Sequence, residues 1–175
     1  MRLSAFILST ALIAAPAFAA LKPGTIAPGF TARATLGGKE FTYSLPDALK
    51  KGPVVLYFYP AAFTPGCSVE ANAFAEAMDK FAALGASVIG VSGDDIDVLN
   101  KFSVSECRSK FPVAADADKT IMEIYDAKLA FGYANRTSYV IAPNGEIIYE
   151  YTALDPSGHV ENTLKALEGW KGGGR

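Results

Sequence analysis

Residues 54–71 read VVLYFYPAAFTPGCSVEA, in which an apolar run stops at a proline and a short turn leads to a cysteine. The run 54–59 is almost continuously apolar and rich in β-branched and aromatic residues, as expected of a central strand that is covered on both faces. The Thr-Pro-Gly sequence at 64–66 predicts a turn, and apolar residues at helical spacing begin just after it. We therefore expect a buried strand followed directly by a helix, with Cys67 in the first turn of that helix.

The position of Cys67 favours a reactive thiolate. Unpaired backbone N–H groups and the helix dipole at a helix start stabilise an anion, and the thiolate is the nucleophilic form of cysteine. Most free cysteines instead pack in the core as small apolar residues. The turn at 64–66 is of an exposed kind, so we interpret Cys67 as a reactive residue rather than a packing one.

The first residues of the chain form a targeting pattern. Arg2 supplies a positive charge, residues 3–15 are apolar, and residues 17–19 read AFA, the small-x-small form of a cleavage site. A membrane anchor is the alternative, but the apolar run is shorter than the roughly 20 residues that a spanning helix needs. We predict a signal peptide over 1–19 and export to the periplasm, although a eukaryotic secretory signal has a similar form.

The remaining residues, 20–175, have the length of one domain. The chain is 50% apolar, which is enough for a core without disulfide bonds. The formal net charge is −2, and loss of Arg2 makes the chain only more acidic. The charge therefore gives no indication of binding to nucleic acid or to an anionic membrane surface.

The two cysteines and the single histidine exclude several kinds of site. The cysteines do not form Cys-x-x-Cys and lack the spacing of zinc ligands. His159 follows Pro-Ser-Gly at a predicted helix start, where we expect it to face solvent. Without another histidine, a Cys–His hydrolase is hard to assemble.

The order of the predicted elements indicates an α/β fold. Helical spacing alternates with short β-prone runs, and Gly-Gly and Asn-Gly mark two hairpins. This order suits a mixed sheet flanked by helices, the thioredoxin-like fold, with an added N-terminal β-hairpin. The predicted strands are 30–35, 39–43, 54–59, 87–92, 111–114, 138–142 and 147–152, the predicted helices are 45–50, 68–84, 94–110, 118–125 and 158–167, and 171–175 form a flexible tail.

Two short motifs resemble those of a known family. Pro60, Thr64 and Cys67 have the spacing of the active-site motif of the peroxiredoxins, and residues 64–71, TPGCSVEA, are similar to the bacterioferritin-comigratory, or Q-type, subgroup. Residues 136–141, RTSYVI, resemble the family's second signature, in which an arginine precedes a core strand. The resemblance extends over nearly all of the chain beyond the predicted leader.

The resemblance implies a thiol-dependent peroxidase that reduces hydrogen peroxide and organic hydroperoxides. Cys67 would be the peroxidatic nucleophile, Thr64 would hold the peroxide and the thiolate, and Pro60 would wall the pocket. Arg136 would donate hydrogen bonds to the reacting oxygens, and Glu70 would orient that arginine. Taken singly, these residues also suit plain structural roles. No metal, haem or flavin is implied, because sulfur alone can carry the redox change.

The second cysteine separates this chain from many Q-type members. Those members carry a resolving cysteine at the position of Asn72 in this chain. Others resolve through a cysteine in the next helix, about one turn out of register with Cys107. The resemblance therefore implies a Cys67–Cys107 disulfide that a thioredoxin-like dithiol reduces. A one-cysteine mechanism with a structural Cys107 is the alternative.

Two rival functions belong to other classes. A thiol–disulfide oxidoreductase of the same fold would need Cys-x-x-Cys, and residues 64–67 lack the first cysteine. A non-catalytic thioredoxin-fold binding or chaperone module stays open. For the peroxidase we expect peroxide and a thioredoxin-like dithiol as partners, no nucleic acid or membrane partner, and a monomer or weak homodimer.

Overall fold

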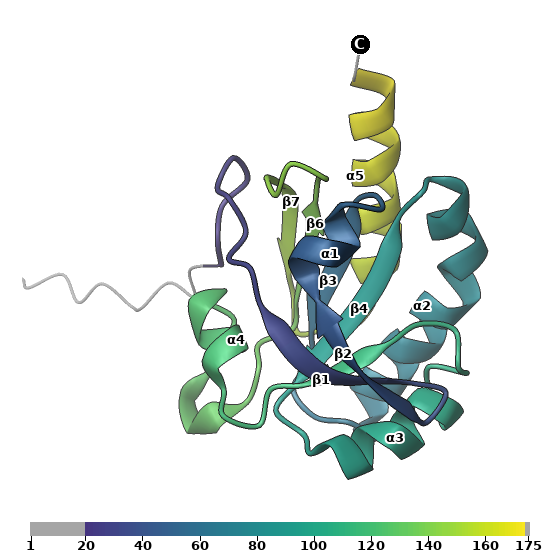
Figure 1. Cartoon of the computed structure of the whole chain (residues 1–175), viewed down its shortest axis with the longest axis vertical. Coiled ribbons are helices and arrows are strands. Elements are labelled where there is room, and N and C mark those ends of the chain that lie inside the picture. The colour runs from purple at the N-terminus through teal and green to yellow at the C-terminus, as the bar shows by residue number, and fades with distance from the viewer. Residues whose placement is uncertain (1–19, 174–175) are drawn as a thin grey trace, which may run out of the picture.

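The computed structural model describes residues 20–173, which fold around a mixed seven-stranded sheet of order β2-β1-β5-β4-β3-β6-β7 (Figure 1). The strands are β1 Thr31–Leu36, β2 Lys39–Ser44, β3 Val54–Phe58, β4 Ser87–Ser92, β5 Val113–Ala115, β6 Thr137–Ile141 and β7 Ile147–Thr152. The helices are α1 Leu45–Leu49, α2 Pro65–Ala83, α3 Ile96–Ser105, α4 Thr120–Ile124 and α5 His159–Gly173, with a short 3-10 helix η1 at Ala130–Gly132. The predicted α/β architecture is confirmed, and the predicted leader lies outside the described residues. No helix in the described range is both long enough and apolar enough to cross a membrane.

The apolar run at the centre of the sequence pattern forms β3, and all of its residues are buried. β3 pairs in parallel with β4 and antiparallel with β6. Successive side chains of a strand point to opposite faces, so Val55 and Tyr57 enter one core cluster while Val54, Leu56 and Phe58 enter another. Both faces of the sheet therefore need a covering layer.

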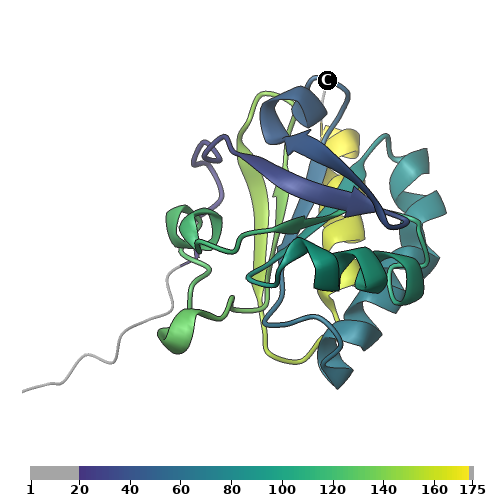
Figure 2. The same cartoon turned by 60° about the horizontal axis from the view of Figure 1, so that its bottom comes forward.

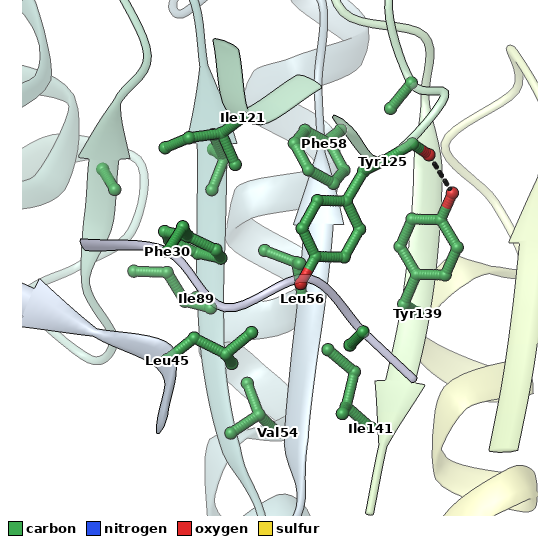
Figure 3. Packing of buried hydrophobic residues seen from close by; sticks show 14 of the residues in the cluster. Phe30, Leu45, Val54, Leu56, Phe58, Ile89, Ile121, Tyr125, Tyr139 and Ile141 are labelled. Carbon is green, nitrogen blue, oxygen red and sulfur yellow. Dashed lines mark hydrogen bonds between the residues drawn. The ribbon is translucent and has the colours of Figure 1, made fainter. Parts of the chain in front are cut away.

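Different helices cover the two faces. α2, α3 and α5 pack on one face and α1 and α4 on the other, and α2 packs against α5 (Figures 1 and 2). Figure 3 shows the α1–α4 face, where Phe58, Tyr125 and Tyr139 gather and the Tyr139 hydroxyl donates to the Tyr125 carbonyl oxygen at 2.7 Å. Cys67 and Cys107 both belong to the cluster on the opposite face, so that face carries the candidate site.

The N-terminal hairpin extends the sheet as predicted. β1 and β2 pair antiparallel, and Gly37 and Gly38 in the turn have φ angles of 58° and 75°. Glycine adopts this left-handed region without a steric penalty. β1 also pairs with β5, and β5 pairs with β4, so the hairpin continues the sheet beyond the thioredoxin-like strands.

The chain before the hairpin is tied to the opposite half of the sheet. The backbone N–H of Gly24 donates to the Ile147 carbonyl oxygen at 2.8 Å. The backbone N–H of Leu21 donates to the Tyr139 hydroxyl at 3.2 Å, and Ala20 is only 6% exposed. The residues just after the predicted cleavage site are therefore part of the folded domain.

α3 ends at Ser105, so the prediction of a helix reaching Lys110 is wrong. Arg108 and Ser109 have φ angles of 52° and 54°, a left-handed conformation that interrupts a helix and is uncommon for residues other than glycine. Cys107 therefore lies in the irregular segment after the helix and not within it.

α5 continues to Gly173, well past the predicted helix end at Leu167. Lys171, predicted to begin a flexible tail, is thus helical. Once a helix has nucleated, each added residue gains a backbone hydrogen bond. The helix can therefore extend beyond the residues that pack against the sheet.

Candidate active site

Cys67 lies in the first turn of α2, as the sequence predicts. Thr64 is the N-cap residue, with an extended φ of −73° and ψ of 147°, and Pro65 occupies the first helical position, which suits its fixed φ and missing N–H. The turn at 63–65 is exposed, but Cys67 itself is only 1% exposed. The turn before the helix is therefore exposed as expected, while the first helical turn directs the Cys67 side chain inward.

Three contacts hold the Arg136 guanidinium beside the sulfur. Nη2 donates to Cys67 Sγ at 3.4 Å, Nε donates to the Leu154 carbonyl oxygen at 3.0 Å, and Nη1 donates to the Glu70 carboxylate. A Cβ atom on Gly66 would lie 3.1 Å from Nη2, so glycine at this position allows the close approach. The structure thus brings together the cysteine, the arginine and the glutamate that the sequence predicts.

Glu70 and Arg136 are both buried. Burial raises the pKa of Glu70 to about 8, and the positive charge of Arg136 offsets only part of this effect. Burial works to lower the pKa of Arg136, but the negative charges of Glu70 and Cys67 outweigh it and raise that pKa. Arg136 therefore stays charged while two acidic groups compete for it.

No cluster of three or more His, Cys, Asp or Glu side chains within 20–173 is arranged to hold a metal ion.

His159 lies behind Glu70, and the prediction that it faces solvent is wrong. It is 0% exposed, because α5 packs on β6 and β7. Nδ1 lies 2.8 Å from Ser138 Oγ and 3.6 Å from Glu70 Oε1, and Nε2 lies 3.0 Å from the Ala153 carbonyl oxygen. Burial lowers the pKa of His159 to about 4, so the imidazole is uncharged near neutral pH.

Thr64 and Pro60 lie in the loop that leads to Cys67. Pro60 is half-buried just after β3, and Thr64 is exposed. The Thr64 hydroxyl donates to the Ala61 carbonyl oxygen at 3.0 Å, so it is engaged within the loop. Both residues therefore belong to the loop that joins β3 to the first turn of α2, just before Cys67 in the chain.

Asp94 anchors this loop from the segment that follows the neighbouring strand β4, a role that sequence reasoning missed. Its Oδ2 accepts from the Ala62 backbone N–H at 2.7 Å and from the Ser92 hydroxyl at 2.7 Å. Ser92 ends β4, the parallel neighbour of β3. The signal available in the sequence was an acidic residue two positions after the end of a buried strand.

Cys107 is a buried free thiol in the same apolar cluster as Cys67. Asn72 Nδ2 donates to the Ser68 carbonyl oxygen at 2.9 Å and to Glu106 Oε2 at 3.3 Å. The Asn72 side chain thus links α2 to the residue that precedes Cys107. Burial raises the pKa of Cys107 above its ordinary value, and the charge of Glu106 adds to this effect, so Cys107 is a protonated thiol near neutral pH.

A row of aromatic rings joins the turn before Cys67 to α3, the helix that precedes Cys107 in the chain. Phe63 meets Phe102 edge-on with ring centroids 5.3 Å apart, Phe102 stacks on Tyr59 at 5.5 Å, and Tyr59 lies 5.4 Å from Tyr57. Phe63 has a φ of 63°, which is uncommon for a bulky residue. The row therefore connects a strained turn before Cys67 to the α3 helix.

Comparison with known proteins gives the family. The profile of the AhpC/TSA family matches residues 23–150. This chain belongs to the AhpC/TSA family. Its relatives include a chloroplastic peroxiredoxin Q of Gentiana triflora, 34% identical over 154 residues that cover 86% of this chain and 69% of that protein. A putative chloroplastic peroxiredoxin Q of Oryza sativa subsp. indica is 36% identical over 148 residues, covering 83% of this chain and 66% of that protein.

These relatives confirm the resemblance to the Q-type peroxiredoxins. This chain spans about two thirds of the length of the two peroxiredoxin Q relatives. Among solved structures, the peroxidoxin BcpB of Mycobacterium tuberculosis is similar with a TM-score of 0.77 and 29% identity, covering 85% of this chain and 97% of that one. Peroxiredoxin Q of Xanthomonas campestris is similar with a TM-score of 0.70 and 25% identity, covering 78% and 89%.

Proposed function

We propose that this protein is a thiol-dependent peroxidase that reduces hydrogen peroxide and organic hydroperoxides at Cys67. The observation that carries the proposal is the Arg136 guanidinium 3.4 Å from Cys67 Sγ at the start of α2. A permanent positive charge and the free N–H groups of a first helical turn both favour the thiolate over the thiol. The peroxiredoxin Q relatives support the same activity.

The reaction begins when the Cys67 thiolate attacks one peroxide oxygen. The S–O bond forms as the O–O bond breaks, and the sulfur becomes a sulfenic acid. The other oxygen leaves as hydroxide or alkoxide and takes up a proton to give water or an alcohol. Negative charge moves from the sulfur to the leaving oxygen, so fixed donors at these positions lower the barrier.

Residues around the sulfur supply what this step needs. Arg136 provides donors beside the reacting atoms from a guanidinium that is already held in place. Thr64 would hold the peroxide once its hydroxyl leaves the Ala61 carbonyl oxygen, and Pro60 would limit water near the sulfenic acid. Consumption of hydrogen peroxide by the purified, reduced protein with a dithiol tests the proposal. A protein that consumes no peroxide would be the non-catalytic binding or chaperone module.

We further propose that Cys107 resolves the Cys67 sulfenic acid as a disulfide. The bond requires Cα atoms within about 7 Å and a thiolate on the attacking cysteine. Because Cys107 is buried and its pKa is raised, its segment has to open before it reacts. Arg108 and Ser109 have left-handed backbone conformations. Opening of this segment would relieve their backbone strain, which favours local opening. A thioredoxin-like dithiol would then reduce the disulfide by thiol exchange.

Treatment of the reduced protein with one equivalent of hydrogen peroxide is expected to give a monomer that has lost two hydrogens. Peptide mapping under non-reducing conditions should join the Cys67 and Cys107 peptides. Cys107→Ser should still consume the first equivalent, but it should stall as the sulfenic acid with a thioredoxin-type reductant and overoxidise more readily. Small thiols should restore its turnover, because they reach the sulfenic acid directly.

The same experiment distinguishes the one-cysteine mechanism. In that case the wild-type protein would accumulate a stable sulfenic acid or form a Cys67–Cys67 dimer. Either product would make Cys107 a core residue and would leave the peroxidase activity itself unaffected.

We also propose that residues 1–19 direct export to the periplasm and are removed. The support is the pattern of Arg2, the apolar run and Ala17-Phe18-Ala19. Protein recovered from a periplasmic fraction is expected to begin at Ala20 by N-terminal sequencing. Recovery of the intact Met1 form from the cytoplasm would contradict export.

A further inference from the structure

The loop from β3 to α2 is held at two points by the end of β4 and the residues just after it. The backbone N–H of Tyr59 donates to the Val91 carbonyl oxygen at 3.2 Å. The backbone N–H of Ala62 donates to Asp94 Oδ2 at 2.7 Å. The first contact joins two backbone groups, whereas the second depends on a side chain. The position of Ala62, shortly before Cys67 in the chain, therefore depends on Asp94.

The peptide group between Ala61 and Ala62 is bonded at both of its ends. Its N–H donates to the Asp94 carboxylate, and its carbonyl oxygen accepts from the Thr64 hydroxyl at 3.0 Å. A hydrogen bond to a charged acceptor is stronger than one to a neutral acceptor, and hydrogen bonds in a chain polarise one another. The carboxylate therefore makes the carbonyl oxygen a better acceptor, and Asp94 acts on Thr64 through a single peptide group.

The Asp94 carboxylate is itself held in place. Oδ2 also accepts from the Ser92 hydroxyl at 2.7 Å, and Ser92 is fully buried. Between these two residues, the Gly93 carbonyl oxygen accepts from Lys119 Nζ at 2.7 Å. A Cβ atom on Gly93 would overlap Lys119 Nζ, so glycine leaves room for this contact. Side-chain and backbone contacts thus fix the carboxylate before any substrate arrives.

The turn that Asp94 anchors has a strained backbone. Phe63 has a φ of 63° and lies between Ala62 and Thr64, the two residues that these hydrogen bonds hold. A bulky residue keeps such a conformation only where the surrounding structure determines it. Without the Asp94 carboxylate, the turn is free to relax to ordinary backbone angles, and Thr64 moves with it.

We propose that Asp94 is a positioning residue of the peroxide site: through the peptide between Ala61 and Ala62, its carboxylate fixes the position from which Thr64 holds the peroxide. This role rests on the proposed peroxidase function, in which the Thr64 hydroxyl leaves the Ala61 carbonyl oxygen to bind the peroxide. An anchored loop limits this step to the rotation of one side chain. Displacement of a substrate-binding group by about 1 Å can slow a reaction roughly 100-fold.

Asp94→Ala is expected to slow the first oxidation of Cys67 by hydrogen peroxide roughly 10- to 100-fold. Iodoacetamide is the comparison reagent, because its reaction with Cys67 needs the thiolate but not Thr64. Alkylation of Cys67, assigned by peptide mapping, should be at least as fast as in the wild type, since a relaxed turn exposes the buried sulfur. The ratio of the oxidation rate to the alkylation rate should therefore fall. Loss of both rates by the same factor would mean a purely structural role and would overturn the proposal.

Asp94→Asn and Asp95→Ala are the matched variants. The asparagine oxygen can accept from the Ala62 N–H while its amide group donates to the Ser92 oxygen, so Asp94→Asn should retain most of the wild-type oxidation rate. Asp95 is exposed and its side chain does not cap α3, so Asp95→Ala removes a neighbouring charge and should leave both rates unchanged. A wild-type oxidation rate in folded Asp94→Ala, or an equal loss in Asp95→Ala, would overturn the proposal.

Hydrogen exchange of the Ala62 amide, followed by NMR, tests the anchoring contact without peroxide. We expect the amide to be protected in the wild type and in Asp94→Asn, and to exchange faster in Asp94→Ala. An unprotected Ala62 amide in the wild type would overturn the proposal even if the Asp94 variants fail to fold. A wild type with a protected amide but without any reaction with peroxide would instead refute the peroxidase function and not the anchoring of the loop.

Discussion

Cys67→Ser is expected to lower the rate of peroxide reduction by about 10⁴-fold or more. A serine hydroxyl does not ionise near neutral pH, even beside a guanidinium, and its oxygen cannot accept a further oxygen atom as sulfur can. The peroxide therefore meets no nucleophile. The substitution exchanges one atom in the buried first turn of α2, so the fold should persist. Hydrogen peroxide consumption with a dithiol reductant measures the loss.

Cys107→Ser is the matched control for this variant. It exchanges the same atom in the other buried thiol, and it should still react with the first equivalent of peroxide. Circular dichroism of both variants would show that the fold is retained. Rapid turnover in Cys67→Ser would mean that another group reduces the peroxide, and the assignment of Cys67 would be lost.

Arg136→Ala is expected to slow the first oxidation of Cys67 about 100-fold or more, the usual loss when one preorganised transition-state donor is removed. The variant loses the donor that lies 3.4 Å from the sulfur. It also removes the positive charge that favours the thiolate. Stopped-flow measurement of the first oxidation separates this step from the later reduction of the protein.

Two variants control for the effect of Arg136. Arg136→Lys keeps the charge but loses the forked geometry that contacts Leu154, Glu70 and Cys67 together, so its rate should lie between those of the wild type and the alanine variant. Arg33→Ala removes an exposed arginine that pairs with Glu40 on the N-terminal hairpin, and it should leave the rate unchanged. A wild-type rate in folded Arg136→Ala would exclude Arg136 from the site.

The elements that the sequence predicts well are those whose signals are local. The continuous apolar run of β3, the Gly37-Gly38 turn and the Thr-Pro-Gly turn before Cys67 each act through neighbouring residues. Their structures follow from backbone conformation and burial over a few positions. Arg136 was identified through its resemblance to a family signature and not through any local pattern.

The features that the sequence did not predict depend on partners far along the chain. His159 sits at a helix start, a position that is usually exposed, but α5 packs on β6 and β7 and buries it. Asp94 is an ordinary acidic residue until the parallel pairing of β3 and β4 brings Ala62 to it. The sequence predicted Cys107 to lie in a helix. Arg108 and Ser109 adopt left-handed conformations, but neither is a glycine, so the sequence contained no signal that the helix would end before them.

The contacts of residues 20–24 with β6 and β7 bear on whether the proposed leader is removed before or after the domain folds. A peptidase that cuts between residues 19 and 20 needs an extended segment in its cleft, yet Ala20 is buried and Gly24 is bonded to Ile147 once the domain has formed. If residues 1–19 are a cleaved leader, as proposed, their removal would therefore precede folding of the domain. Folding then shields the new terminus, so the processed protein should resist trimming by aminopeptidases.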